Sequence, residues 1–104
     1  MNVDLETWIS RARGMARTRG LADDILIKVT PPAHQNGGHV IDFDGTHVVA
    51  QFIVWPSGAI EASHAAVATE HHAHIHNSTA SNVEELDKTF DEFLHILTAI
   101  EKQA

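Results

Sequence analysis

Residues 47–100 constrain the fold most, because strand patterns separated by turn signals lead there into one long amphipathic helix. The first of these strand patterns, THVVAQFIVW (46–55), is preceded by another, HVIDFD (39–44). They meet at Asp44-Gly45, a pair that favours a tight hairpin because both central turn positions accept positive φ. The chain therefore predicts an antiparallel β-hairpin here.

A second turn follows at Trp55-Pro56-Ser57-Gly58, where Pro suits the second position of a type I turn and Gly the fourth. It leads into a strand over AIEASHAAVATE (59–70). The next segment, HHAHIH (71–76), either continues this strand past a bend or forms a short fifth strand. The pattern leaves both arrangements open.

Two helices complete the pattern. Residues 4–19 form an apolar stripe at 3- and 4-residue spacing behind a possible Asp4 cap. Residues 81–100 form a second apolar stripe, and this segment begins with Ser81 and Glu84, which match a capping box. The second stripe contains Val83, Leu86, Phe90, Phe93, Leu94, Leu97 and Ile100.

With a first strand over DILIKVT (24–30), the order predicts an α+β fold. We expect an antiparallel four- to five-stranded meander, with an N-terminal and a C-terminal helix packed on one face. Residues Val48, Ala50, Phe52 and Val54 would lie under the helices. The other side of this strand carries Val49, Gln51, Ile53 and Trp55, and is either an interface or is covered by strand ends and neighbouring loops.

Length and composition narrow the class of protein. A chain of 104 residues accommodates one domain, expected to span residues 1–104. It has no cysteine, no apolar run near the ~20 residues of a membrane helix, and no signal peptide pattern. We therefore expect a soluble cytoplasmic protein without a membrane partner.

Charge points to the kind of partner. The first 19 residues hold four arginines and two acids, whereas the remainder holds twelve acids and three lysines. Direct nucleic-acid binding is disfavoured, because phosphate contacts need a basic face. A basic protein would suit the acidic remainder, although a net charge of −7 also serves solubility alone.

Nine histidines raise the question of a metal site, since His72, His74 and His76 would project from one face of an extended strand. No carboxylate cluster at ligand spacing accompanies them, so we predict no metal and no cofactor. They could also make an interface responsive to pH. His64 and His95 are interpreted as partly buried packing residues.

Catalysis is disfavoured as well. Ser57 lies in W-P-S-G, which is not the G-x-S-x-G elbow of a serine hydrolase. Asp42, Asp44 and Glu61 could meet on neighbouring strands, but in an acidic chain such proximity is expected by chance. We predict that the protein is not an enzyme.

Over residues 47–100 the chain resembles the TriTu family of bacterial immunity proteins. In that family a strand ends in a Trp-x-Ser-Gly turn, a second strand leads to Glu-His-His, and a Ser-x-x-Glu-Glu-Leu helix follows. The segment HIHNSTA, between the histidine pair and the helix, is longer here. The corresponding residues are Trp55, Ser57, Gly58, Glu70, His71, His72, Ser81, Glu84, Glu85 and Leu86.

The resemblance implies an inhibitor of the C-terminal toxin domain of a neighbouring gene product, such as a contact-dependent growth inhibition toxin. Many such toxins are nucleases with basic grooves, which would suit the acidic surface. We expect the protein to act as a monomer or weak homodimer. The candidate toxin-binding residues are Asp42, Asp44 and Glu61 for charge, Ile53 and Trp55 as anchors, and His72, His74 and His76 as adaptable polar contacts.

Two other functions remain as alternatives. A secretion-chaperone-like dimer would use a similar helix-on-sheet layer to hold an unfolded effector segment. A histidine-rich metal-binding protein is the third hypothesis.

Overall fold

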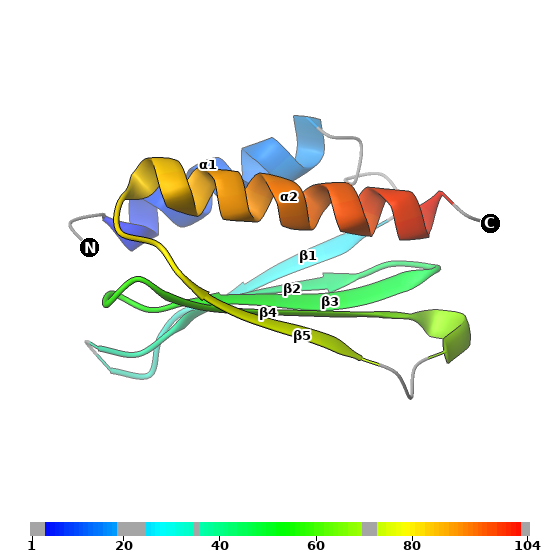
Figure 1. The fold of residues 1–104 in the computed structure, drawn as a ribbon, viewed down its shortest axis with the longest axis horizontal. Coiled ribbons are helices and arrows are strands. Elements are labelled where there is room, and N and C mark those ends of the chain that lie inside the picture. Colours follow the sequence, from blue (N-terminus) through cyan, green and yellow to red (C-terminus); the bar gives the residue numbers. More distant parts are fainter. Residues whose placement is uncertain (1–3, 19–24, 35, 70–72, 103–104) are drawn as a thin grey trace.

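A computed structural model describes residues 4–18, 25–34, 36–69 and 73–102 of the chain. Two helices lie side by side on one face of a single antiparallel sheet, which confirms the predicted α+β fold (Figure 1). The elements are α1 (Leu5–Thr18), β1 (Leu26–Thr30), β2 (His39–Asp44), β3 (Val48–Val54), β4 (Ala59–Ala66), the 3₁₀ helix η1 (Val67–Thr69), β5 (His74–Thr79) and α2 (Val83–Glu101).

The sheet order is β1-β2-β3-β4-β5, so each strand pairs with its neighbour in the chain. The register places Phe43 opposite Ala50, Phe52 opposite Ala62, and His64 opposite His74. Because opposed residues of an antiparallel pair share a face, this register divides the strand residues into a helix-covered side and a side that faces away from both helices.

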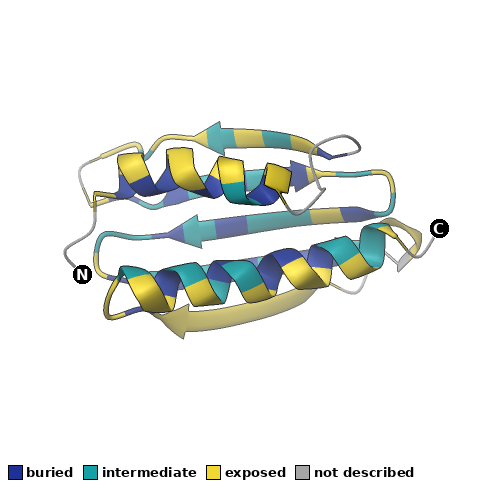
Figure 2. Ribbon diagram, turned by 90° about the horizontal axis from the view of Figure 1, so that it is seen from above, coloured by how far each residue is buried: buried dark blue, intermediate teal, exposed yellow. Residues whose placement is uncertain are grey.

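The core lies between the sheet and the helices. Phe52 and Phe90 are fully buried, and their ring centroids lie 4.9 Å apart in an edge-to-face arrangement. Trp8 meets the edge of Phe90 at 5.2 Å, so residues from α1, β3 and α2 share one aromatic cluster. Figure 2 shows buried residues along the inner side of both helices. The prediction that Val48, Ala50, Phe52 and Val54 face the helices is confirmed, with Ala50 only partly buried.

Helix α1 begins where the sequence predicts. The Asp4 carboxylate accepts hydrogen bonds from the backbone N–H groups of Glu6 (3.1 Å) and Thr7 (3.3 Å), and from the Thr7 hydroxyl (2.8 Å). These bonds lower the pKa of the Asp4 carboxyl, with the Thr7 hydroxyl making the largest contribution. The capping prediction is therefore confirmed.

The N-cap of α2 lies one residue later in the chain than the sequence predicts. Asn82, not Ser81, is the N-cap, and its Oδ1 accepts the N–H of Glu85 at 2.9 Å. Glu85, not Glu84, reaches back, and its Oε2 accepts the N–H of Ser81 at 2.8 Å. Two overlapping polar patterns occur here, and the extended backbone of Asn82 selects the second one.

The turn at Trp55-Pro56-Ser57-Gly58 forms as expected. The N–H of Gly58 donates to the carbonyl of Trp55 at 2.9 Å, and Gly58 has φ 95°. Ser57 serves this turn, because its Oγ accepts the N–H of Ala59 at 3.3 Å. Glycine is needed at position 58, since positive φ is unfavourable for residues with a Cβ.

The β2–β3 connection differs from the prediction. Asp44 still pairs with Val49, so the loop is longer than the two-residue Asp-Gly turn, and neither Asp44 nor Gly45 has positive φ. The carboxylate of Glu101, at the end of α2, instead accepts the backbone N–H of His47 at 2.8 Å and that of Thr46 at 3.3 Å. The helix end thereby stabilises the loop.

Residues 74–79 form a separate fifth strand, which decides between the two arrangements left open by the sequence. None of the helices within the described chain is long and apolar enough to cross a membrane.

Candidate functional site

Five of the candidate residues come together on the side of the sheet that faces away from the helices, here called the open face. The register pairs Asp42 with Gln51, Asp44 with Val49, and Glu61 with Ile53, and all of these share the open face. Trp55 continues the alternation two residues after Ile53. Residues from β2, β3 and β4 that are distant in sequence therefore lie on one surface.

Trp55 and Ile53 lie against Gly38, immediately before β2. A Cβ built on Gly38 would approach Ile53 Cγ2 to 2.7 Å and Trp55 Cε2 to 2.9 Å. The missing side chain is what lets both apolar groups lie close against the backbone. Trp55 and Ile53 are half-buried, so each keeps part of its surface available to a partner.

Carboxylates lie on the same face as these apolar groups. Glu61 is directly opposite Ile53, and Asp42 accepts a hydrogen bond from Gln51 Nε2 at 2.9 Å. Among the strand residues of the open face, three carboxylates (Asp42, Asp44 and Glu61) accompany one cation, Lys28, which pairs with Asp42 in the register. The open face thus combines apolar side chains with a net negative charge.

Further apolar side chains extend this surface. Leu26 is 69% exposed, Ile75 is 59% exposed and Val49 is 37% exposed, and the register places all three on the open face. Leu26 and Ile75 were not among the binding residues predicted from the sequence. The alternation of Ile25, Ile27 and Val29 could have indicated Leu26, because it assigns the intervening residue to the opposite side.

Two of the three candidate histidines do not belong to this surface. His74 and His76 lie on the helix side of β5, next to His64 of β4. Their rings are stacked on His64, with centroid distances of 5.0 Å and 5.9 Å and interplanar angles of 18° and 13°. His72 lies outside the described residues. The candidate set is therefore divided between the two sides of the sheet.

Stacking matters for metal binding, because coordination needs ring nitrogens that converge on one point, whereas stacked imidazoles present their faces to each other. Within the described residues no group of three or more histidines and carboxylates is arranged to hold a metal ion.

His64 is buried, and its Nδ1 has no hydrogen-bond partner. Burial lowers the pKa of His64, and the neighbouring charges of His74 and His76 lower it further. The prediction of a packing role is confirmed for His64 but is wrong for His95. His95 lies on the outer side of α2, is exposed, and has its Nε2 3.5 Å from Asp91 Oδ2.

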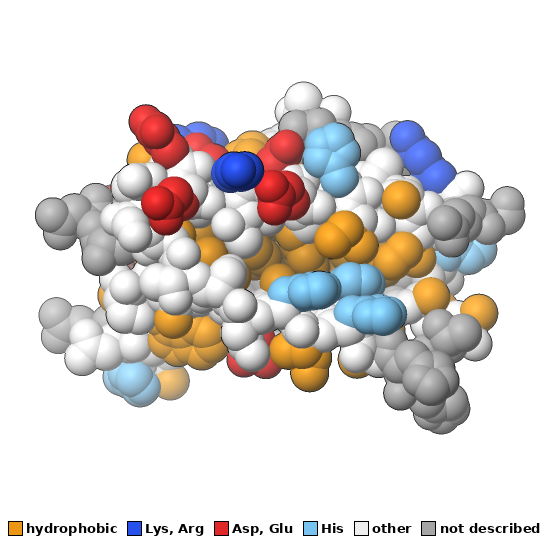
Figure 3. All heavy atoms as spheres, viewed as in Figure 1, with side chains coloured by type: hydrophobic (Ala, Val, Ile, Leu, Met, Phe, Trp, Pro, Cys, Tyr) orange, Lys and Arg blue, Asp and Glu red, His pale blue; other side chains and the backbone are white. Residues whose placement is uncertain are grey.

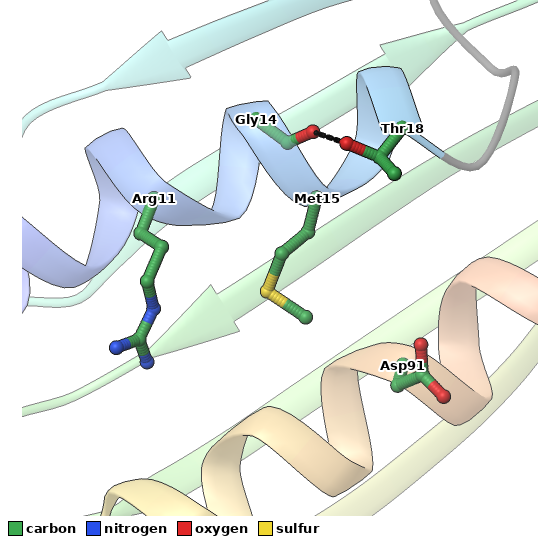
Figure 4. A pocket seen from close by; sticks show the side chains of 5 residues that line it. All are labelled: Arg11, Gly14, Met15, Thr18 and Asp91. Atoms are coloured by element: carbon green, nitrogen blue, oxygen red, sulfur yellow. Dashed lines mark hydrogen bonds between the residues drawn. The ribbon is translucent and has the colours of Figure 1, made fainter.

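A polar contact that was not predicted from the sequence joins the two helices. Asp87 Oδ1 accepts hydrogen bonds from Trp8 Nε1 (2.8 Å) and from Arg11 Nη2 (2.6 Å). Beside it lies a shallow hollow lined by Arg11, Gly14, Met15, Thr18 and Asp91 (Figure 4). Its charged groups already have partners, since Arg11 binds Asp87 and Asp91 contacts His95. This hollow offers a weaker site than the open face.

Comparison with known proteins places the chain in a family. The family model described as "Immunity protein TriTu" matches residues 4–96, which is most of the chain. No curated protein and no solved structure matches it.

Proposed function

We propose, because this chain belongs to the TriTu immunity protein family, that it neutralises a cognate bacterial toxin domain by binding it in a stoichiometric complex. Toxin neutralisation is what the family designation implies. The finer proposal is that the partner is a nuclease domain delivered by contact-dependent inhibition or a related system, and that the complex forms in the cytoplasm without bond chemistry by the immunity protein.

The open face is the observation that carries this proposal. Protein interfaces are usually centred on a few aromatic or aliphatic anchors surrounded by polar groups. Trp55 and Ile53 supply such anchors at the end of β3. Glu61 lies directly opposite Ile53, and Asp42 and Asp44 lie further along the same face. A nuclease groove that binds phosphates is basic, so its potential would be complementary to this surface.

The two kinds of residue would act at different stages of binding. Carboxylates attract a basic partner over long range and raise the association rate, especially at low salt. Apolar anchors act after contact, because burying them slows dissociation. The bound protein would then exclude the substrate from the groove.

Binding assays with a catalytically inactive form of the cognate toxin domain test the proposal. Trp55→Ala should raise the Kd by about 30-fold or more, the size expected for a central interface residue. Val67→Ala is the control, since Val67 is 40% exposed but lies in η1, outside the anchor group. Co-expression with the active toxin should reproduce the ranking as loss of protection.

A charge exchange tests the steering step. Glu61→Lys should lower the association rate several-fold at low salt and have a smaller effect at high salt, because salt screens the attraction. Glu84→Lys makes the same change on α2 and should have a smaller effect. Equal effects of the two variants would show that net charge, not the open face, governs association.

A further inference from the structure

Within the described part of the chain, no strand pairs with the outer edge of β5. All six of its residues are exposed, and Figure 2 shows it exposed beside α2. The opposite edge, β1, carries Lys28 and is followed directly by Pro31 and Pro32, which are features that discourage pairing with another strand. No lysine or proline occurs in β5. The two edges of the sheet are therefore unequal.

The hydrogen-bond pattern identifies which groups of β5 are free to pair. The N–H of Ala80 donates to the carbonyl of Gly58 at 2.8 Å, so residues 58 and 80 form a hydrogen-bonded pair. In an antiparallel ladder such pairs alternate. His74, His76 and Ser78 therefore bond towards β4, whereas the N–H and C=O groups of Ile75, Asn77 and Thr79 point to the outer edge.

A groove runs between this edge and α2. Its apolar lining comes from Ala62, Phe93 and Ile96, and its polar lining includes His76, Ser78, Thr89 and Glu92. In Figure 3 a group of histidine side chains lies below an apolar strip, and acidic side chains lie above it on the helix layer. A strand added beside β5 would place alternate side chains on this side of the sheet.

The charge of the groove selects the kind of strand. Glu92 lines the groove, and Glu85 lies two turns earlier on the same stripe of α2, with Lys88 as the cation between them. A second copy of the chain would bring another acidic α2 and another net charge of −7 to the same edge. Charge therefore favours a foreign strand with basic and apolar side chains over self-association.

We infer that β5 is a docking edge at which an extended, basic strand of the toxin adds to the sheet and inserts its side chains into the groove beside α2. This inference rests on the proposed function and adds a second contact, distinct from the open face. Strand addition is an established mode of peptide recognition, in which backbone hydrogen bonds give affinity and adjacent pockets give specificity.

A matched pair of variants at Asn77 tests the inference. Asn77→Pro removes an outward N–H and places a ring where the added strand would approach, yet it leaves the bonds to β4 intact. It should raise the Kd for the inactive toxin domain by about tenfold or more. Asn77→Ala removes the same side chain and keeps the N–H, so it should bind within about threefold of the unchanged protein.

Amide hydrogen exchange of the unmodified protein provides an independent measurement. The amides of Ile75, Asn77 and Thr79 should exchange rapidly in the free protein and become protected in the complex. Unchanged exchange of these amides in a tight complex, together with equal binding by the two Asn77 variants, would overturn the inference and leave the proposed function standing. A toxin domain that does not bind at all would refute both, and protection through a dimer of the free protein would assign the edge to a second copy.

Discussion

At the scale of single residues, His64 is a polar side chain whose burial in the core is unfavourable in free energy. Its ring is 8% exposed and stacked on His74 and His76, while its Nδ1 has no hydrogen-bond partner. Burial and the two neighbouring imidazoles disfavour its protonated form, so its pKa lies below the ordinary value of 6.5. A pKa lowered by folding links the stability of the folded chain to pH.

We expect the protein to lose stability as the pH falls below 6.5, because the unfolded chain then binds a proton at His64 more readily than the folded chain does. His64→Phe retains the stacked ring without a titrating nitrogen and should flatten this loss. Urea unfolding over a series of pH values measures the effect. His95→Gln is the control, and it should keep the acid loss of the unchanged protein because His95 is exposed.

Two glycines allow a matched test of close packing. Gly38→Ala should lower the free energy of unfolding by about 1–3 kcal/mol, since the new methyl group would overlap Ile53 and Trp55. Gly14→Ala should stabilise the protein by about 0.5–1 kcal/mol, because a Cβ at this position of α1 meets no atom within 4 Å. Thermal unfolding measures both changes. The NMR signal of the Trp55 indole N–H should shift only in Gly38→Ala, and an unmoved signal would contradict the proposed contact.

At the scale of elements, the sequence predicted the order and nature of nearly all the segments, because periodicity follows from burial on one side. The ends of elements were less accurate, since they depend on single hydrogen bonds. Ser81 and Asn82 are both residue types that favour the N-cap position. Only the extended backbone at Asn82 shows which of the two is the N-cap. The prediction of a two-residue turn at Asp44-Gly45 was wrong. It could not include the contact of this loop with Glu101, because Glu101 is distant in sequence.

The candidate site was predictable only where strands are joined by well-defined turns. The turn at Gly58 fixes β4 relative to β3, so the placement of Glu61 beside Ile53 follows from the alternation. Between β4 and β5 lies η1, after which the alternation starts again. A shift of one residue exchanges the two sides of a strand, which is why the side on which His74 and His76 lie could not be derived from sequence.

The cap of α2 yields a prediction at this scale. Asn82→Ala should lower the free energy of unfolding by about 1 kcal/mol, because the N–H of Glu85 loses its acceptor. Ser81→Ala should have little effect, since Ser81 contributes its backbone N–H to the bond with Glu85, not its hydroxyl. Denaturant unfolding of both variants measures the difference. The opposite ranking would restore the capping box first predicted at Ser81 and Glu84.

At the scale of the whole molecule, both helices and the sheet depend on one aromatic cluster. Phe90 is fully buried and contacts Trp8, Phe43 and Phe52. Asp87 adds a polar link between the helices through Trp8 and Arg11. We propose that the chain unfolds as one unit, because no element retains a core of its own without this cluster.

Phe90→Ala tests this proposal. This substitution should lower the free energy of unfolding by about 3–5 kcal/mol, which is a large part of the total stability of a small protein. Helical circular dichroism and the fluorescence of Trp8 and Trp55 should lose signal at the same denaturant concentration. Ile96→Ala, which truncates a 38% exposed side chain of the same helix, should cost much less. Separate transitions for helix and fluorescence would show more than one folding unit.

The sequential order of the strands also bears on how the chain is made. As it leaves the ribosome, each strand finds its partner in the segment just synthesised, so the sheet can assemble during translation. The apolar side of the sheet nevertheless stays partly open to water until residues 83–101 emerge and α2 packs over it. A chain that stops before α2 would therefore expose apolar surface and be prone to degradation.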